Sequence, residues 1–206
     1  MTRVAHIIGN GDNAQMYKPS KGLKITCNLP PFPVENVYTT CIVDFKMCAA
    51  ITEGSVIIPG DWTLGYRPKA WYDKNTGNFR MRFGHQIKEF YTDLPKYAIL
   101  PGDGPGQGYT NLNCGHMATH YTANKLKADE IHMYGFDSIF DMNLRSSTDF
   151  VLNSDRGATN NVRLTDKWRP IWQGIFKEFS NIQFVLHHPH SQIKFPVPDN
   201  VEFSVK

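Results

Sequence analysis

The chain begins with a short apolar run that ends abruptly at a glycine turn. The run is Val4–Ile8, and Gly9-Asn10-Gly11 follows it directly. An apolar run of this length that stops at a turn is typical of a buried strand. The chain is therefore expected to start with a buried strand that carries a tight turn at its carboxyl end.

Strand-like and helix-like segments alternate along the rest of the chain. Such alternation implies a mostly parallel sheet with helices on both faces. We therefore expect a single α/β domain over 1–206 with a Rossmann-like architecture. The later strands are expected at 23–27, 37–43, 55–58, 97–100, 130–135 and 182–186, and the helices at 45–51, at 114–127 and from Thr165 or Asp166 to Phe179.

The segment 61–109 departs from this pattern. It is rich in aromatic, glycine and charged residues and has no sustained period. Asn75-Thr76-Gly77-Asn78 fits the turn of a hairpin between Trp71-Tyr72 and the alternating run 79–83. We therefore expect 61–109 to be an irregular insertion or lid, with a mobile glycine-rich loop at 101–109.

Composition excludes several classes of protein. The chain has 206 residues, of which 41% are apolar and 13% aromatic, and its net charge is +3. So many aromatic residues and so small a net charge exclude a disordered chain, and the composition is not that of a coiled coil. The basic residues are scattered, so we expect no nucleic-acid partner.

The apolar stretches and the cysteines indicate the cellular compartment of the protein. The longest apolar stretches, such as 56–58, are far shorter than the roughly 20 residues of a membrane-spanning helix, and no signal peptide is expected. The four cysteines are spread out without a C-x-x-C pair. We expect reduced thiols and a cytoplasmic protein with no membrane span.

The glycine turn is the first candidate binding element. Gly9 and Gly11 let backbone N–H groups approach a phosphate or ribose closely, with Asn10 and Asp12 beside them. Ala14 stands where the dinucleotide fingerprint has its third glycine, so the turn is not that fingerprint. A tight turn that needs glycine for its own geometry explains the same residues, and this alternative stays open.

Two further elements join the turn. Asn28 follows the second strand, where its amide could offer a donor and an acceptor to a base or ribose, or could simply belong to a loop. Asn113 can cap a helix that starts with Cys114 and Gly115. The next strand ends at Gly135-Phe136-Asp137, which places an acid on the ligand rim of an open α/β sheet, although Asp137 could equally cap a turn.

Taken together, these motifs resemble the bacterial sialyltransferases that modify lipooligosaccharide and the related domain of motility-accessory-factor glycosyltransferases. The resemblance covers about 4–60 and 110–190. It implies a nucleotide-sugar substrate, most plainly a CMP-linked one, and a glycan or other hydroxyl acceptor, with no further cofactor. It assigns nucleotide contacts to Gly9, Asn10, Gly11, Asp12, Asn28, Asn113, Cys114 and Gly115.

One departure from the family concerns catalysis. The family has a catalytic histidine just before the helix that precedes the last strand, and the corresponding stretch, Thr159–Asp166, has none. His116, at the start of a helix, is our hypothesis for a substitute general base, with Asp137 to orient it. A packing role for His116 is the alternative.

The chemistry of individual side chains suggests which residues could bind a phosphate group or a metal ion. Tyr109 and Arg163 are candidate phosphate partners, since arginine matches phosphate geometry, although each could be an ordinary surface residue. His187 and His188 are adjacent on a strand and point to opposite faces, so no metal site is expected.

The sequence thus predicts a glycosyltransferase-like protein that uses a nucleotide-activated sugar. The alternative is a catalytically degenerate nucleotide-binding or assembly protein on the same fold. A nucleotide pyrophosphokinase ranks last because the chain has no Asp-x-Asp pair. A homo-oligomer stays open.

Overall fold

The structure, a computed structural model, describes every residue except 76, 105, 141–147, 149–151, 153–157 and 206, and for 158–165 it describes the backbone alone. Eight strands of the described chain form one sheet in the order β5-β4-β3-β2-β1-β6-β7-β8. Every pair of neighbouring strands is parallel. The strands are β1 (Val4–Ile8), β2 (Leu23–Cys27), β3 (Val37–Ile42), β4 (Trp62–Leu64), β5 (Ile87–Phe90), β6 (Glu130–Tyr134), β7 (Gln183–His187) and β8 (Val201–Ser204).

Helices begin and end at residues suited to those positions. The Asp44 side chain accepts from the backbone N–H of Lys46 at 3.0 Å, and Gly54, at φ 81°, closes the same helix. The described α-helices are α1 (Phe45–Glu53), α2 (Tyr66–Lys74), α3 (Asn78–Phe83), α4 (Gly108–Asn111), α5 (Cys114–Asn124) and α7 (Ala158–Glu178). The 3-10 turns are η1 (Asp12–Met16), η2 (Gly84–Gln86), η3 (Lys96–Ala98) and η4 (Asp137–Ile139).

The sheet is wound in two directions from its centre. From β1 the chain adds β2 to β5 on one side, and it then returns to place β6 on the other side of β1 and adds β7 and β8. Because crossover connections are right-handed, the two directions place their connecting segments on opposite faces. The boundary between β1 and β6 is therefore a topological switch point, where open α/β sheets bind their ligands.

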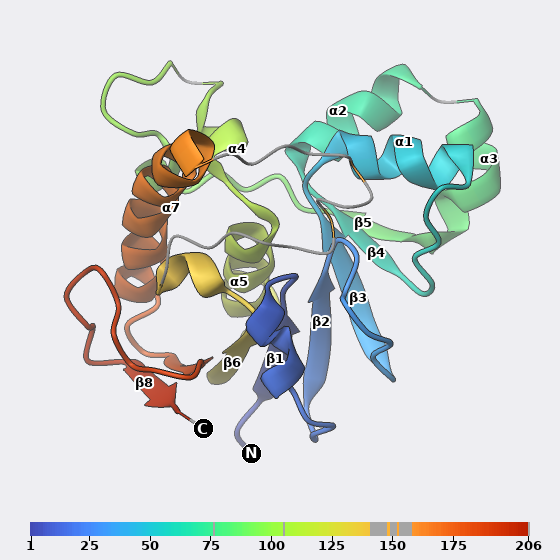
Figure 1. Cartoon of the computed structure of the whole chain (residues 1–206). Helices are drawn as coiled ribbons and strands as arrows, with labels where there is room; N and C mark the ends of the chain where they lie inside the picture. Colours follow the sequence, from blue (N-terminus) through green and yellow to red (C-terminus); the bar gives the residue numbers. More distant parts are fainter. Residues whose placement is uncertain (76, 105, 141–147, 149–151, 153–157, 206) are drawn as a thin grey trace.

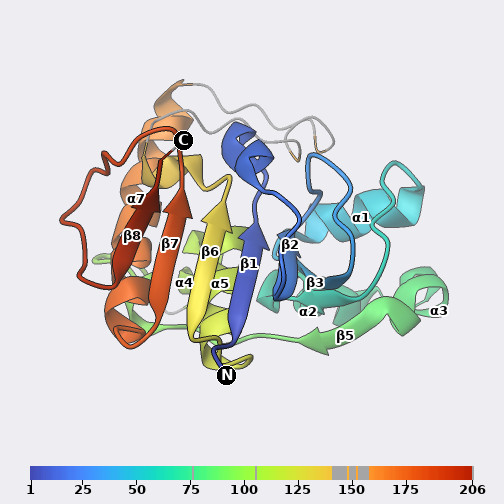
Figure 2. The same ribbon diagram turned by 90° about the horizontal axis from the view of Figure 1, so that it is seen from below.

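Helices cover both faces of the sheet. Cys41 belongs to the core that holds residues of α5 and α7, whereas the next residue, Ile42, belongs to a second core with α1 and α3. Successive strand residues point to opposite faces, so these two cores lie on the two sides of the sheet. Figure 1 shows α1, α2 and α3 grouped together near β4 and β5, and Figure 2 shows β8, β7, β6 and β1 side by side with α5 and α7 behind them. The expected α/β, Rossmann-like architecture is confirmed.

The segment 61–109 has regular elements, which corrects the expectation of irregular structure. It supplies β4 and β5 to the sheet, and α2 and α3 stand where the hairpin was expected. The run 79–83 alternates in sequence, but Phe79 and Phe83 are also four residues apart, and both rings face Trp62 at centroid distances of 6.1 and 5.9 Å. Met81 between them is exposed, as a helix requires. That 61–109 is an insertion stays an expectation.

Other element boundaries also differ from the expectation. The structure has no strand at 55–58, and 97–100 overlaps the 3-10 turn η3 rather than a strand. The helix expected from Thr165 or Asp166 begins at Ala158, and a further strand, β8, follows the one that was expected to be last. The strand β8 was missed although its residues, Val201-Glu202-Phe203-Ser204, alternate between apolar and polar, because a run of four residues is a short signal.

Candidate functional site

The carboxyl edge of the sheet, where the carboxyl ends of the strands lie, brings the glycine turn against the end of β6. Gly9 donates its N–H to Tyr134 O at 2.8 Å, and Gly11 donates to Gly135 O at 3.1 Å. A Cβ on Gly9 would lie 2.8 Å from Gly135 O, and one on Gly11 would lie 2.5 Å from the Asp137 carboxylate. Both glycines are therefore required by the close approach of the two turns, which is the alternative explanation that the sequence left open.

The Asn10 side chain joins this turn to the end of β2. Its amide nitrogen donates to Cys27 O at 2.7 Å and also to Leu29 O. Both amide protons are thus used on backbone carbonyls. Asp12, which opens η1, is exposed.

Asn28 follows β2 and is held in an unusual conformation. Its φ is 48°, in the left-handed region that asparagine tolerates better than most residues. Its backbone N–H donates to Cys41 O at 2.8 Å, and only 8% of the residue is exposed. The side-chain Oδ1 is buried and has no hydrogen-bond partner among the residues that the structure describes. A buried acceptor without a donor is costly, so this oxygen is suited to a donor from a ligand.

Asp137 faces the glycine turn rather than His116. Its carboxylate accepts from the Asn13 side chain at 2.9 Å and from the Asn13 backbone N–H at 3.4 Å. Burial raises the pKa of this carboxyl above its usual value, although the two Asn13 donors lower it. No hydrogen bond joins Asp137 to His116 in the described part of the chain, so the orienting role expected for Asp137 has no contact to support it.

Asn113 caps α5, as expected, and His116 completes the cap. Asn113 Oδ1 accepts from the His116 N–H at 2.8 Å, while the Asn113 N–H donates to His116 Nδ1 at 3.1 Å. This reciprocal pair is a capping box. Nδ1 is thus an acceptor, and the neutral ring carries its proton on Nε2, which lies 3.2 Å from Trp168 O.

The His116 ring is fully buried, and both of its nitrogens are engaged within the protein. Burial lowers its pKa to about 3, so the ring is neutral over the physiological range. Its contacts favour a structural role over that of a base in contact with substrate, and the catalytic role stays a hypothesis.

Cys114 and Gly115 pack the start of α5 against the sheet. The Cys114 thiol donates to Cys41 O at 2.8 Å, the same carbonyl that receives the Asn28 N–H. A Cβ on Gly115 would lie 2.4 Å from a carbon of the Phe136 ring. All four cysteines are free and buried.

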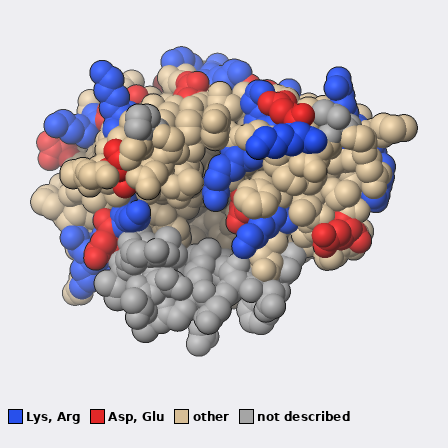
Figure 3. All heavy atoms as spheres, turned by 90° about the horizontal axis from the view of Figure 1, so that it is seen from above, with Lys and Arg blue, Asp and Glu red and all other residues tan. Residues whose placement is uncertain are grey.

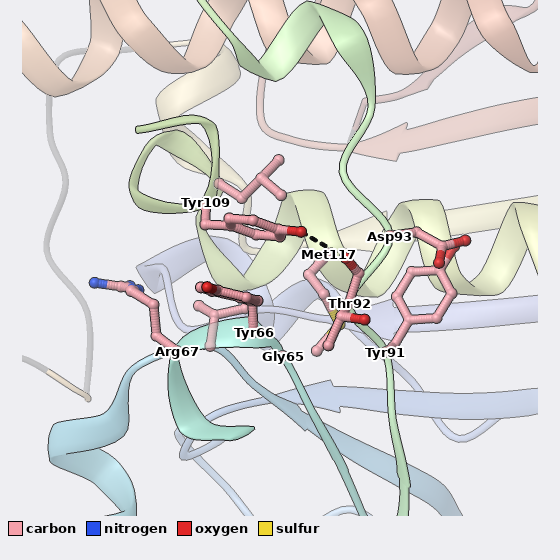
Figure 4. A pocket seen from close by; sticks show the side chains of 10 residues that line it. Gly65, Tyr66, Arg67, Tyr91, Thr92, Asp93, Tyr109 and Met117 are labelled. Atoms are coloured by element: carbon pink, nitrogen blue, oxygen red, sulfur yellow. Dashed lines mark hydrogen bonds between the residues drawn. The ribbon is translucent and has the colours of Figure 1, made fainter. Parts of the chain in front are cut away.

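A pocket that the sequence did not reveal lies further along the carboxyl edge (Figure 4). The space between its walls is about 280 Å³ and includes open solvent, whereas the cavity volume available to a water-sized molecule is about 20 Å³. The segments after β3, β4 and β5 form it together with α4 and α5. Its lining residues are Val43, Gly65, Tyr66, Arg67, Tyr91, Thr92, Asp93, Tyr109, Leu112 and Met117.

Tyr109, a candidate phosphate partner, lies in this pocket. Its ring stacks on Tyr66 with centroids 3.7 Å apart, and its hydroxyl donates to Thr92 O at 3.3 Å. Arg163, the other candidate, belongs to α7, and its side chain lies outside the described residues. The arginine that does line the pocket is Arg67, which sequence reasoning missed because nothing in the local pattern marks it.

The Tyr91 hydroxyl is used inside the protein rather than in the pocket. It forms a 2.7 Å hydrogen bond with His120 Nδ1 and accepts from the Asn124 side chain at 3.0 Å. His120 Nε2 lies 3.3 Å from Glu178, although not in hydrogen-bonding geometry. The Tyr91 hydroxyl thus joins the segment after β5 to α5, and the Tyr91 ring is left to line the pocket.

Within the described residues, no group of three histidines, cysteines or acids is placed to hold a metal ion. No helix in that part of the chain is long and apolar enough to cross a membrane. Comparisons with protein-family models, curated proteins and solved structures give no match for this chain.

Proposed function

We propose that this chain is a glycosyltransferase-like protein that binds a nucleotide-activated sugar, with CMP as the nucleotide, at the carboxyl edge of its sheet. The acceptor is a glycan or another hydroxyl compound. The fold supports a ligand at this edge because β1 and β6 form a topological switch point there.

Asn28 carries the proposal. Its backbone is fixed by Cys41 O, its φ is 48°, and its buried Oδ1 has no donor among the described residues. This oxygen could accept a hydrogen bond from a cytosine amino group or from a ribose hydroxyl. The Gly-Asn-Gly turn, by contrast, is explained by its contacts with β6 and β2 and does not by itself argue for a ligand.

The first test is a thermal-shift panel with CMP, CDP, UDP, GDP and CMP-sialic acid. A ligand that binds only the folded state must raise the melting temperature. We expect CMP and CMP-sialic acid to raise it more than the other nucleotides do. If none of the cytidine compounds raises it, the proposal is wrong.

Asn28→Gly is the matching variant, because glycine accepts the positive φ and only the amide is lost. We expect CMP binding, measured by calorimetry, to weaken by about 1–3 kcal/mol if the amide pairs with a buried ligand group. Asn36→Gly is the control, since Asn36 has φ 54° and is exposed. Equal CMP affinity in the two variants would remove Asn28 from the site.

The second candidate is a binding or assembly protein without catalysis. The engagement of both His116 nitrogens, together with the absence of histidine from Thr159–Asp166, favours it. Assays of transfer to acceptors and of CMP-sugar hydrolysis separate the two candidates. Binding of CMP with neither activity would support the binding protein.

A further inference from the structure

We propose that the Arg67 guanidinium binds the anionic group, a phosphate or a sugar carboxylate, of a ligand whose nucleoside end lies at Asn28. This inference rests on the proposed function and adds a second contact point to the same ligand.

Arg67 is a partly buried cation for which the described part of the chain provides no counter-charge. Its Nε is buried and has no hydrogen-bond partner among the described residues, and no described carboxylate lies within ion-pair distance of it. Removing a guanidinium from water without an acceptor is costly. An anion with two oxygens would match its fork of donors.

The pocket does not supply this anion. Asp93 is the acidic residue in the lining, and its carboxylate already accepts from the Asn124 side chain at 3.2 Å. Figure 4 shows Arg67 and Asp93 at opposite ends of the pocket, with the stacked rings of Tyr66 and Tyr109 between them. No described residue therefore neutralises the positive charge at the end of the pocket that holds Arg67.

The molecular surface is hollowed on one face. Figure 3 shows a hollow in the face seen from above, with Lys and Arg side chains at its rim, and Figure 1 shows α4 and α7 on one side of the molecule and α1 to α3 on the other. Arg67 also belongs to the first turn of α2, where the helix dipole favours negative charge.

The distance between the two contact points suits one ligand. Asn28 follows β2, and Arg67 lies just beyond the end of β4, two strands away. Adjacent strands are about 4.8 Å apart, so the two strand ends are roughly 10 Å apart along the sheet edge. Val43, which directly follows the intervening strand β3, lines the pocket together with Arg67. A nucleotide joined to a sugar can reach from one to the other.

The test uses calorimetric titration of the full chain with cytidine, CMP, CMP-N-acetylneuraminic acid and free N-acetylneuraminic acid. The variants are Arg67→Gln and, as a matched control, Arg82→Gln. Arg82 lies on α3 and donates to Thr52 O at 3.0 Å, outside the pocket. Its substitution removes the same charge from the same part of the molecule.

If Arg67 holds the phosphate, Arg67→Gln weakens CMP binding about 10- to 100-fold and leaves cytidine binding unchanged, since a hydrogen bond to a charged group is lost. If Arg67 holds the sugar carboxylate, CMP binding is unchanged and the two compounds with N-acetylneuraminic acid are weakened. Equal affinities in Arg67→Gln and Arg82→Gln for all four compounds overturn the inference.

Failure of the proposed function gives a different result. If the wild-type chain binds no cytidine compound, the proposed function is wrong, and ligand-detected NMR with inorganic phosphate and N-acetylneuraminic acid then decides the inference. Binding of either compound that Arg67→Gln abolishes sustains the anion site, and binding of neither overturns it.

Loss of folding is controlled separately. Melting temperatures show whether Arg67→Gln is folded, and we expect it to melt close to the wild type. If it does not fold, Arg67→Lys replaces it, because lysine keeps the positive charge but lacks the paired N–H donors of the guanidinium. We expect Arg67→Lys to weaken anion binding by less than tenfold, and unchanged binding in that variant overturns the inference.

Discussion

At the scale of single residues, His116 shows how a histidine in a candidate site can be a structural group. Its folded pKa of about 3 lies below the value of roughly 6.5 in an unfolded chain. Between these values the unfolded state binds more protons, so stability rises with pH in that window. The stability linked to His116 is complete above about pH 6.5 and is lost as the pH falls toward 3.

His116→Gln tests this role, because glutamine at the same position can still accept from the Asn113 N–H. Between pH 7 and about pH 4.5, the wild-type free energy of unfolding should fall by about 2–3 kcal/mol more than that of the variant. Urea titrations at several pH values measure the difference. Parallel pH profiles would show that the buried ring does not control acid stability.

The same variant tests the catalytic hypothesis. If the chain has transferase activity and His116 is the base, the glutamine should lower turnover by roughly 10²–10⁴-fold while nucleotide binding is kept. If His116 serves only as the cap, turnover should remain near that of the wild type.

At the scale of elements, the start of α5 depends on one close contact. A Cβ on Gly115 would meet the Phe136 ring, which itself packs edge-on against Trp172 at a centroid distance of 5.6 Å. Gly115→Ala should therefore lower the free energy of unfolding by about 1–3 kcal/mol, despite the better helix propensity of alanine.

Gly84→Ala is the control, because Gly84 has helical dihedral angles and its nearest neighbour would be 3.7 Å away. We expect that change to be neutral or stabilising by up to about 1 kcal/mol. Denaturant unfolding compares the two. A Gly115→Ala protein as stable as Gly84→Ala would mean that α5 can shift away from β6 without cost.

At the scale of the whole molecule, Asn200 joins the last three elements of the chain, α7, β7 and β8. Its amide nitrogen lies 3.1 Å from Phe176 O, 3.1 Å from Phe179 O and 3.0 Å from Ile182 O. These oxygens belong to the end of α7 and to the segment that leads into β7, and Asn200 itself directly precedes β8. The side chain therefore fixes the last strand to the rest of the sheet.

Asn200→Ala should lower the free energy of unfolding by about 1–3 kcal/mol, since three partly buried carbonyl groups lose their donor. Asn75→Ala removes a hydrogen bond of similar length, 2.8 Å, from an exposed amide to Trp71 O, and should change stability by less than about 1 kcal/mol. Calorimetric melting of both variants makes the comparison. Similar melting temperatures would show that β8 is held by its strand pairing alone.

Local sequence determined the parts of the fold whose signals are local. β1 and β2 lie where their apolar runs predict them, and Asn113 caps α5 as its position before the helix indicates. Alternation of strands and helices is enough to predict a parallel sheet, because parallel strands need crossover connections. Burial of a run and capping of a helix depend on residues a few positions apart, which a single sequence displays.

Where a local pattern fits two structures, only the tertiary structure decided between them, and it alone decided which distant residues are in contact. The run 79–83 fits a strand or a helix, and the helix forms because it lets Phe79 and Phe83 both pack against Trp62. The glycines of the first turn could serve a ligand or a close backbone approach, and the end of β6 shows the close approach. Arg67 and Asn28 reach the same sheet edge because the strand order places β2 two positions from β4. Contacts between strands far apart in the chain follow from the packing of the whole sheet, and no local pattern records them.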